Sequence, residues 1–391
     1  MVWWGIAGGV DEIVRYTYRL RPGAQAQHAL VQEWGRCRFL WNEAVHQQKT
    51  GSKPTLAKLG KLLTELRGRN AWMREGSQVA QQAMLRAYTQ ALQQSYTVKG
   101  RGRPTYKSKK RTWASLEYST RGFSIRGGRL RLPKGVSIPV VWSRELPSDP
   151  TSVRVYQDSL GHWYASFVVR REAKPAPEAE GRIGIDWGVS TTATTTDEPY
   201  DLPYLGHRRR CAAELAKAQR KMARRRRKGG KQSNGYQRAR RQAAKLHKKA
   251  ARQTQHDSRV WAKRVTDNHH LIAVEDFKPT FLATSTMARK AADAAIGAAK
   301  RELVTSAERA GRKGVLVQPA YTTMTCSECF ARAKQALGLD ERTFRCQACG
   351  YTSGRDRNAA RVILAVAERG HTSVEDIRHV QPPFGEVVGA V

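Results

Sequence analysis

Three acidic residues lie far apart in the sequence, each at the edge of an apolar or helical segment. Asp186 stands in the segment GIDWG, Glu275 in AVED and Asp356 in GRDRNAA. Acids are scarce in this chain, which has a formal net charge of +37 on 391 residues. Carboxylate oxygens suit Mg²⁺, with Mn²⁺ as the alternative, and two such ions about 3.5–4 Å apart can activate a water and stabilise a leaving oxygen. The three acids therefore predict a two-metal site for phosphodiester chemistry.

Each acid taken alone also has a structural explanation. Asp186 could begin a turn before Gly188, Glu275 could be a surface acid, and Asp356 could cap the helix that follows it. Their shared placement favours the metal site, because two of them end apolar strands and the third begins an apolar helix. A sheet-based site gathers carboxylates from distant parts of a chain in this way.

Four cysteines form two C-x-x-C pairs, Cys326 with Cys329 and Cys346 with Cys349. The interval between the pairs lies within the range that zinc ribbons use. A gap of two residues lets both sulfurs of a pair reach one ion with tetrahedral geometry. We therefore expect one structural Zn²⁺, and four thiolate ligands would leave no open position for catalysis by that ion.

The charge balance indicates a polyanionic partner, and nucleic acid is the polyanion we expect. Seventy Lys and Arg outnumber 33 Asp and Glu, and binding to phosphates releases condensed counterions. A segment over 207–252, bent at 229–235, holds no acid from Lys217 to Arg252. A solvated helical face normally mixes charges of both signs, so this crowding favours phosphate contact. The candidate contacts are basic residues of this segment and of an upstream patch: Arg220, Lys221, Arg224, Arg225, Arg226, Arg227, Arg238, Arg240, Arg241, Lys107, Lys109, Lys110 and Arg111.

Other features argue against membrane insertion and secretion. The sequence has no stretch of about 18 apolar residues and no basic amphipathic anchor. Its first residues lack the basic region of a secretory signal. Two further cysteines, Cys37 and Cys211, stand alone, which suits a reducing compartment. We therefore expect a cytosolic protein.

Hydrophobic periodicity predicts a β-rich first half with a helical insert. Strand-like alternation occurs at 15–20 and again between 123 and 169, which is typical of a small β-barrel. Between these segments, apolar residues recur at helical spacing in three stretches, so we expect a three-helix insert over 24–98. A stretch rich in Pro, Ala and Glu at 173–181 predicts a linker.

The second half alternates between strands and helices. An amphipathic helix is expected at 288–309 and a final helix at 356–368, with Gly370 as its cap residue. The pattern fades beyond it, so we expect a flexible tail over 371–391. The expected strands are apolar or rich in β-branched residues: 182–185, 191–196, 271–274 and 314–317.

These segments resemble the TnpB family, insertion-sequence proteins related to compact type V CRISPR effectors. GIDWG, AVEDF and GRDRNAA, with two C-x-x-C pairs before the last, are similar to the RuvC-like nuclease domain of that family. In the first half, YRLRP, GRCRFLWN, GRPTYKS and LRLP are similar to its amino-terminal half. The resemblance covers nearly the whole chain.

The resemblance implies an α/β multidomain fold. A wedge, or OB-like, β-barrel carries a helical recognition insert and precedes a RuvC-like nuclease domain of the RNase H fold, into which a Cys₄ zinc ribbon that binds target nucleic acid is inserted. The implied bounds are 12–23 and 99–172 for the barrel, 24–98 for the insert, 182–319 and 353–370 for the nuclease domain, and 320–352 for the ribbon.

The implied function is that of an Mg²⁺-dependent, RNA-guided DNA endonuclease that recognises a short motif beside its target. Asp186, Glu275 and Asp356 would bind the catalytic metals. The implied partners are guide RNA, double-stranded target DNA and the guide–target heteroduplex. The protein would act as a monomer or homodimer in the prokaryotic cytosol or nucleoid.

Three departures from the family pattern keep other functions open. Gly354 stands where an acid is usual, Phe330 where a glycine is usual, and Trp187 where a smaller apolar residue is usual. The main alternative is an RNA-guided DNA-binding protein that represses its target with little or no cleavage. A generic RNA-binding or transposition-accessory protein would explain the charge but not the three acids.

Overall fold

A computed structural model of the chain describes residues 2–3, 11–51, 54–109, 112–173, 176–277, 288–335, 338 and 341–380. The chain divides into two compact units. We call Val10–Ala173 the N-terminal unit, and Lys174–Val391 together with Met1–Gly9 the C-terminal unit. Within the described ranges, no helix combines the length and the apolar composition that crossing a bilayer would require.

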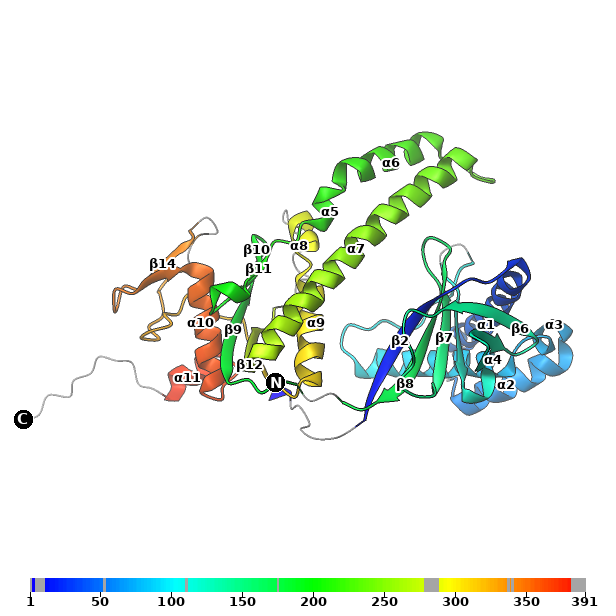
Figure 1. The fold of residues 1–391 in the computed structure, drawn as a ribbon, viewed down its shortest axis with the longest axis horizontal. Helices are drawn as coiled ribbons and strands as arrows, with labels where there is room; N and C mark the ends of the chain where they lie inside the picture. Colours follow the sequence, from blue (N-terminus) through cyan, green and yellow to red (C-terminus); the bar gives the residue numbers. More distant parts are fainter. Residues whose placement is uncertain are drawn as a thin grey trace, which may run out of the picture. The chain divides into compact units, whose positions relative to one another are not determined.

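The N-terminal unit is built on a seven-stranded antiparallel sheet with the order β3-β7-β8-β2-β6-β5-β4 (Figure 1). Its central strands pair without interruption, from Glu12 opposite Arg171 to Leu20 opposite Trp163. The strands are β2 (Glu12–Leu20), β3 (Ser115–Ser119), β4 (Ser124–Arg126), β5 (Arg129–Leu132), β6 (Val136–Val141), β7 (Ser152–Gln157) and β8 (Trp163–Arg171).

The described residues between β2 and β3 form four helices, one more than the three expected. They are α1 (Ala24–Lys49), α2 (Leu56–Arg69), the short α3 (Ala71–Arg74) and α4 (Gln78–Thr97). One apolar core joins them to a single face of the sheet, with Leu40 of α1, Tyr88 of α4 and Phe167 of β8 all buried. Among the described residues of this unit, no helix of this core packs against the other face of the sheet.

The C-terminal unit contains a six-stranded sheet with the order β1-β13-β12-β9-β10-β11. Its three central strands, β9, β12 and β13, are parallel, and β10 is antiparallel to β9. The edge strand β1 pairs with β13, an assignment that the sequence pattern did not reveal. The strands are β1 (Val2–Trp3), β9 (Gly181–Trp187), β10 (Thr191–Thr195), β11 (Leu202–Pro203), β12 (His269–Glu275) and β13 (Lys313–Val317).

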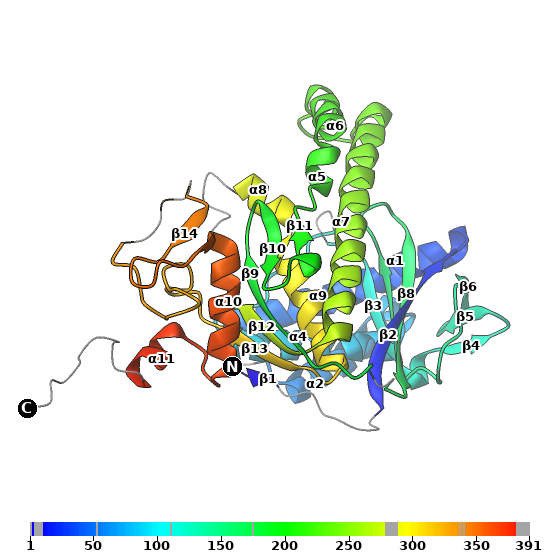
Figure 2. The ribbon, with the colours of Figure 1, turned by 60° about the vertical axis from the view of Figure 1, so that its left-hand side comes forward.

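Helices cover both faces of this sheet (Figures 1 and 2). Helices α7 and α9 share a core with Ile185 and Val274 on one face, whereas α10 and α11 share a core with Ala273 on the other. The helices are α5 (His207–Arg210), α6 (Ala212–Arg225), α7 (Asn234–Asn268), α8 (Ala288–Ala294), α9 (Ile296–Arg309), α10 (Arg355–Glu368) and α11 (Val374–Val380). A two-stranded ribbon, β14 (Thr343–Arg345) and β15 (Thr352–Gly354), precedes α10.

Two expectations about this unit differ from the structure. The single helix expected at 288–309 is broken at Ala295, whose φ of 57° lies in the left-handed region, and the carbonyl of Ala294 accepts a hydrogen bond from Thr192 Oγ1 at 3.3 Å. The flexible tail expected from residue 371 instead begins with helix α11, because the side chains of Val374 and Ile377 are buried in the core beneath α10. Residues 381–391 lie outside the described residues.

Candidate metal centres and nucleic-acid surfaces

Asp186 and Glu275 lie side by side at the carboxyl ends of two neighbouring parallel strands. The pairing of Val274 with Ile185 places the two acids one residue further along β12 and β9. Side chains alternate between the faces of a strand. Because Ile185 and Val274 face the core under α7 and α9, the two acids face α10.

Helix α10 brings Asp356 to the same edge of the sheet. It runs antiparallel to β9, since Arg182 at the start of β9 forms an ion pair of 3.2 Å with Glu368 at the end of α10. The close approach depends on Gly184, where a Cβ atom would lie 2.0 Å from the carbonyl oxygen of Ala360. Asp356 is in the first turn of α10, at the end where β9 reaches Asp186.

Burial and mutual repulsion disfavour the charged forms of these acids. Asp186 is 6% exposed and Glu275 is 7% exposed. Burial, followed by repulsion from Glu275 and Asp356, raises the pKa of Asp186 well above its ordinary value. Burial raises the pKa of Glu275 to about 7, although the backbone N–H of Trp187 and the charge of Lys300 oppose the rise. A cation among the carboxylates would relieve both costs.

The structure contradicts the three explanations that treat each acid alone. Asp186 lies within strand β9 and is buried, so it does not begin a turn. Glu275 is buried and is not a surface acid. The N-cap position of α10 is Gly354, so Asp356 does not cap that helix. None of the three carboxylates therefore has the local role that its sequence context suggested.

The three side chains fit Mg²⁺ or Mn²⁺, because they offer hard carboxylate oxygens. Two basic side chains beside them neutralise part of the negative charge. Arg342 Nη1 lies 4.0 Å from Asp356 Oδ2, and Lys300 Nζ lies 2.7 Å from Asp276 Oδ1. The three carboxylates are not gathered as tightly as the cysteines, which form the cluster of metal-ligating groups found within the described part of the chain.

The four cysteines converge on one point, with all their Sγ atoms within 4.8 Å of one another. The Sγ atoms of Cys326 and Cys349 are 3.7 Å apart, and those of Cys329 and Cys346 are 3.6 Å apart. Tetrahedral zinc with Zn–S bonds of about 2.3 Å requires sulfur separations of about 3.8 Å. The cluster therefore has the size and the ligand chemistry of a Cys₄ zinc site.

Backbone N–H groups prepare this cluster for metal binding. Although burial opposes ionisation of Cys346, hydrogen bonds from the N–H groups of Cys349 and Ala348 lower its pKa to about 7. The thiol of Cys326 is completely buried, and burial raises its pKa to about 12. A bound cation deprotonates such thiols outright. The two values indicate a site that needs a metal to become fully anionic.

The residues that depart from the TnpB pattern have physical explanations in two of three cases. Phe330 has a φ of 58°, a backbone conformation in which glycine would be unstrained. The phenylalanine is explained by its side chain, because the ring packs beside the α10–α11 core and its centre lies 4.0 Å from the guanidinium of Arg369. Trp187 Nε1 donates to the carbonyl of Glu275 at 3.2 Å and so ties β9 to β12. A Cβ at Gly354 would have only Arg357 as a neighbour, at 3.8 Å, so nothing there requires glycine.

The long basic segment forms a two-helix arm, α6 and α7, which projects from the sheet of the C-terminal unit (Figures 1 and 2). Small residues such as Ala218 and Ala239 are buried along it. All nine candidate contacts on the arm are exposed: Arg220, Lys221, Arg224, Arg225, Arg226, Arg227, Arg238, Arg240 and Arg241. The arm therefore presents a dense positive surface.

The upstream basic patch differs from this arm. Lys107 is half-buried, with its ammonium 3.7 Å from the ring centre of Trp41, and burial lowers its pKa. Its backbone N–H donates to Asn42 Oδ1 at 2.8 Å, so Lys107 also has a structural role. Lys109 is exposed. Lys110 and Arg111 lie outside the described residues.

The uncovered face of the seven-stranded sheet carries aromatic and basic side chains that the sequence reasoning missed. Tyr156 and Tyr164 stack with their ring centres 5.5 Å apart, and the guanidinium of Arg19 lies 5.3 Å from the ring of Tyr164. Arg15 on β2 and Arg154 on β7 are exposed on either side of β8. Aromatic rings and arginines on an open sheet are typical of surfaces that stack nucleic-acid bases. Alternation of these residue types along β2, β7 and β8 was the available signal.

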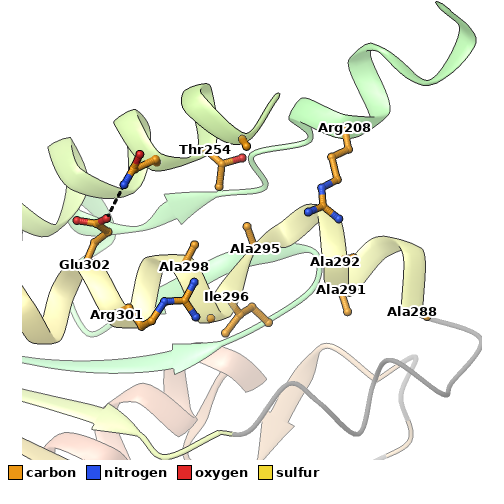
Figure 3. A pocket seen from close by; sticks show the side chains of 13 residues that line it. Arg208, Thr254, Ala288, Ala291, Ala292, Ala295, Ile296, Ala298, Arg301 and Glu302 are labelled. Atoms are coloured by element: carbon orange, nitrogen blue, oxygen red, sulfur yellow. Dashed lines mark hydrogen bonds between the residues drawn. The ribbon is translucent and has the colours of Figure 1, made fainter. Parts of the chain in front are cut away.

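A groove of about 520 Å³ lies between α7 and the junction of α8 and α9 (Figure 3). Arg208 and Arg301 line it together with small side chains, including Ala291 and Ala295. Glu302 accepts a hydrogen bond from Gln255 along one side of the groove. None of the three acids lines this groove.

Comparisons with known proteins cover most of the chain in separate segments. The model of the family described as "Probable transposase", of the OrfB type, matches residues 166–283, and that of the Cas12f1-like TNB domain matches 298–363. A helix-turn-helix model matches 13–53, where the described chain has strand β2 and one long helix, α1.

Two curated relatives align over most of their length and are provisionally named RNA-guided DNA endonucleases. The protein from Streptomyces pristinaespiralis is 29% identical over 93% of this chain and 91% of its own. InsQ from Escherichia coli K12 is 28% identical over 90% and 91%. The chain is TnpB-like and close to the type V effectors.

Further comparisons of this TnpB-like chain involve CRISPR-associated proteins. The CRISPR-associated endodeoxyribonuclease Cas12f1 of Sulfoacidibacillus thermotolerans is 38% identical over 64 residues, which is 16% of this chain and 15% of that protein. A Cas12f1–sgRNA–target DNA complex has a TM-score of 0.48 at 13% identity, covering 91% of this chain and 98% of the other. The mini-RNA-guided endonuclease CRISPR-Cas phi3 has a TM-score of 0.40 at 9% identity, covering 92% of each chain.

Proposed function

We propose that the chain is an RNA-guided DNA endonuclease that binds a guide RNA, recognises a short motif beside its target and cleaves DNA at a two-metal, RuvC-like site. The observation that carries the proposal is the placement of Asp186, Glu275 and Asp356 at one edge of the parallel strands, with the first two buried. Buried acids that repel each other are unfavourable without a cation, so their position fits a metal site better than a structural role.

The three carboxylates would hold the divalent ions, which supply an activated water and neutralise the leaving oxygen when bound. Metal binding needs the anionic form of each acid. Lys300 favours that form because its positive charge lowers the pKa of Glu275. The hydrogen bond from Trp187 Nε1 to the carbonyl of Glu275 fixes the end of β12 against β9.

The four cysteines would hold one structural Zn²⁺. Four sulfur ligands complete a tetrahedral site, so this ion would fold the segment between β13 and α10 without taking part in catalysis. The sulfur separations of 3.6 and 3.7 Å support this role.

Two surfaces would bind nucleic acid. The α6–α7 arm has exposed positive charge suited to the backbone of a guide–target heteroduplex, whose sequence is read by base pairing. The open sheet face of the N-terminal unit has the stacked pair Tyr156 and Tyr164, suited to unpaired bases of a guide RNA. The names of the two relatives that align over most of their length support an RNA-guided DNA nuclease.

One experiment tests the proposal directly. The protein is purified with its bound nucleic acid, the RNA is sequenced, and duplex DNA matching that RNA is incubated with the complex and Mg²⁺. We expect one defined RNA species and cleavage that Asp186→Ala abolishes. Since Asp186 is buried and belongs to neither nucleic-acid surface, RNA binding should be unchanged in the variant.

Two other outcomes lead to different conclusions. A defined RNA without any difference between wild type and Asp186→Ala would refute cleavage and support an RNA-guided binder that occupies its target. If no defined RNA copurifies, both RNA-guided functions are wrong.

A further inference from the structure

The residues on either side of Asp356 are anchored to two different parts of the C-terminal unit. The backbone N–H of Arg355 donates to the carbonyl of Arg342 at 2.8 Å, and its side chain donates to the carbonyl of Gly338 at 2.7 Å. On the other side, both Nη atoms of Arg357 donate to the carboxylate of Asp201, each at 2.9 Å. Asp356 is thus held between the cysteine-bearing segment and the sheet.

Asn358 makes the most buried of these connections. Its side chain is 0% exposed. Its Nδ2 donates to the carbonyl of Thr325 at 2.7 Å, and its Oδ1 accepts from the backbone N–H of Ser327 at 3.0 Å. These two residues flank Cys326, which is also completely buried. One amide therefore binds both sides of the first metal-ligating cysteine.

The chemistry of this position requires an amide. Asparagine offers a donor and an acceptor together, whereas aspartate only accepts and leucine does neither. Residues two apart on a helix point in different directions, so Asn358 can contact the cysteine segment while Asp356 faces the strand ends. Asn358 can therefore influence the acid only through the backbone of α10.

We infer that Asn358 is a positioning residue that makes the placement of Asp356 depend on the folded state of the Cys₄ segment. The inference rests on the proposed function, because it concerns the third acid of that site. Loss of the structural ion would loosen the backbone around Cys326, release Asn358 and free the first turn of α10. The metal site on the sheet and the cysteine site are then energetically coupled, although they share no ligand.

The test compares the full-length wild type with Asn358→Ala, each with zinc bound and after treatment with a zinc-selective chelator. Three quantities are measured: zinc per chain, hydrogen exchange of the backbone amides at 355–361, and the affinity for Mn²⁺ by electron paramagnetic resonance. Asn268→Ala is the matched control, because Asn268 donates to the carbonyl of Arg264 within α7 and contacts no part of the cysteine segment.

In the wild type, zinc removal should speed exchange at 355–361 and weaken Mn²⁺ binding by about 10–100-fold, the usual effect of losing an outer-shell partner. Asn358→Ala should keep its zinc, because all four cysteines remain, but should already show both defects. Chelation should then add less to them than it does in the wild type, since both perturbations act on the Asn358 connection and only the Arg355 contacts remain to be loosened. Asn268→Ala should behave like the wild type.

Several results would overturn the inference. One is wild-type exchange and Mn²⁺ affinity in zinc-loaded Asn358→Ala; another is additive losses from mutation and chelation. If the variant loses zinc or does not fold, the measurements on the wild type decide. Unchanged hydrogen exchange at 355–361 after zinc removal from the wild type would then refute the inference. A wild type that binds no Mn²⁺ and cuts no matched DNA would refute the proposed function, while the exchange measurement would still test the coupling.

Discussion

Replacing Glu275 with glutamine should make the metal-free protein clearly more stable at pH 8 and change its stability by less than about 1 kcal/mol at pH 5. Burial first, and then neighbouring acids, raise the pKa of Glu275 from 4.5 to about 7. The folded state therefore binds this proton more tightly than the unfolded state. Stability from the protonated group is fully present below pH 4.5 and is lost as the pH rises through 7.

The magnitude follows from the size of this rise. At 1.36 kcal/mol per pKa unit, the ionised Glu275 costs about 3 kcal/mol of the free energy of unfolding at pH 8. Glutamine has nearly the same shape and does not ionise, so Glu275→Gln should recover that amount. For a domain of roughly 150–250 residues, this corresponds to a rise in melting temperature of about 6–12 °C.

The assay is thermal unfolding of both proteins from pH 5 to pH 8 in buffer free of Mg²⁺ and Mn²⁺. The difference between them isolates Glu275, because the large background charge is common to both. Glu308→Gln, which removes an exposed carboxylate from α9, is the control and should show no such trend. Added Mg²⁺ should stabilise the wild type more than Glu275→Gln. A difference that is the same at pH 5 and pH 8, or equal stabilisation of both proteins by Mg²⁺, would refute the reasoning.

Three further predictions concern α10, the cysteine site and the arm. Gly184→Ala should push α10 away from β9 and lower the free energy of unfolding by about 1–3 kcal/mol, so that both the melting temperature and cleavage fall. Gly60→Ala is the control: its Cβ would meet nothing within 4 Å, so it should be neutral or stabilising. Equal melting temperatures of the two variants would contradict this account. Cys349→Ser should lose zinc by elemental analysis, and Cys211→Ser should retain it. Three glutamine substitutions on the arm, at Arg220, Lys221 and Arg224, should reduce the salt dependence of RNA binding by about 2–3 in its log–log slope without changing the melting temperature. An unchanged slope would show that these side chains do not contact phosphates.

Much of the candidate site follows from local sequence patterns. Apolar runs that end at Asp186 and Glu275 mark parallel strands, whose carboxyl ends meet at one edge of a sheet whatever the length of chain between them. The C-x-x-C spacing fixes the geometry of each cysteine pair before the rest of the fold is known. These features were predictable because each depends on residues close together in the sequence.

The remaining features depend on contacts between distant segments. In the sequence, Gly184 looks like an ordinary strand residue. Only the structure shows that α10 packs so closely against it that a Cβ atom would not fit. The sequence shows Asn358 only as a polar residue in an apolar helix, and the positions of Thr325 and Ser327 explain it. No glycine or proline in the sequence predicts the helix break at Ala295. The carbonyl of Ala294 accepts a hydrogen bond from Thr192, which lies on another element. Local propensity says nothing about such partners.

The order of the acids along the chain has a consequence for the synthesis of this protein. Chains emerge amino-terminal end first, and domains fold as units while translation continues. The N-terminal unit, Val10–Ala173, and the basic arm, α6 and α7, precede Asp356 in that order. The N-terminal unit can therefore fold before the last acid and its anchoring segment leave the ribosome, whereas the arm belongs to the unit that carries the acids. On the proposed function, a guide RNA bound by the N-terminal unit would meet a chain that cannot yet cut, and the capacity for cleavage would come later than the capacity to bind RNA.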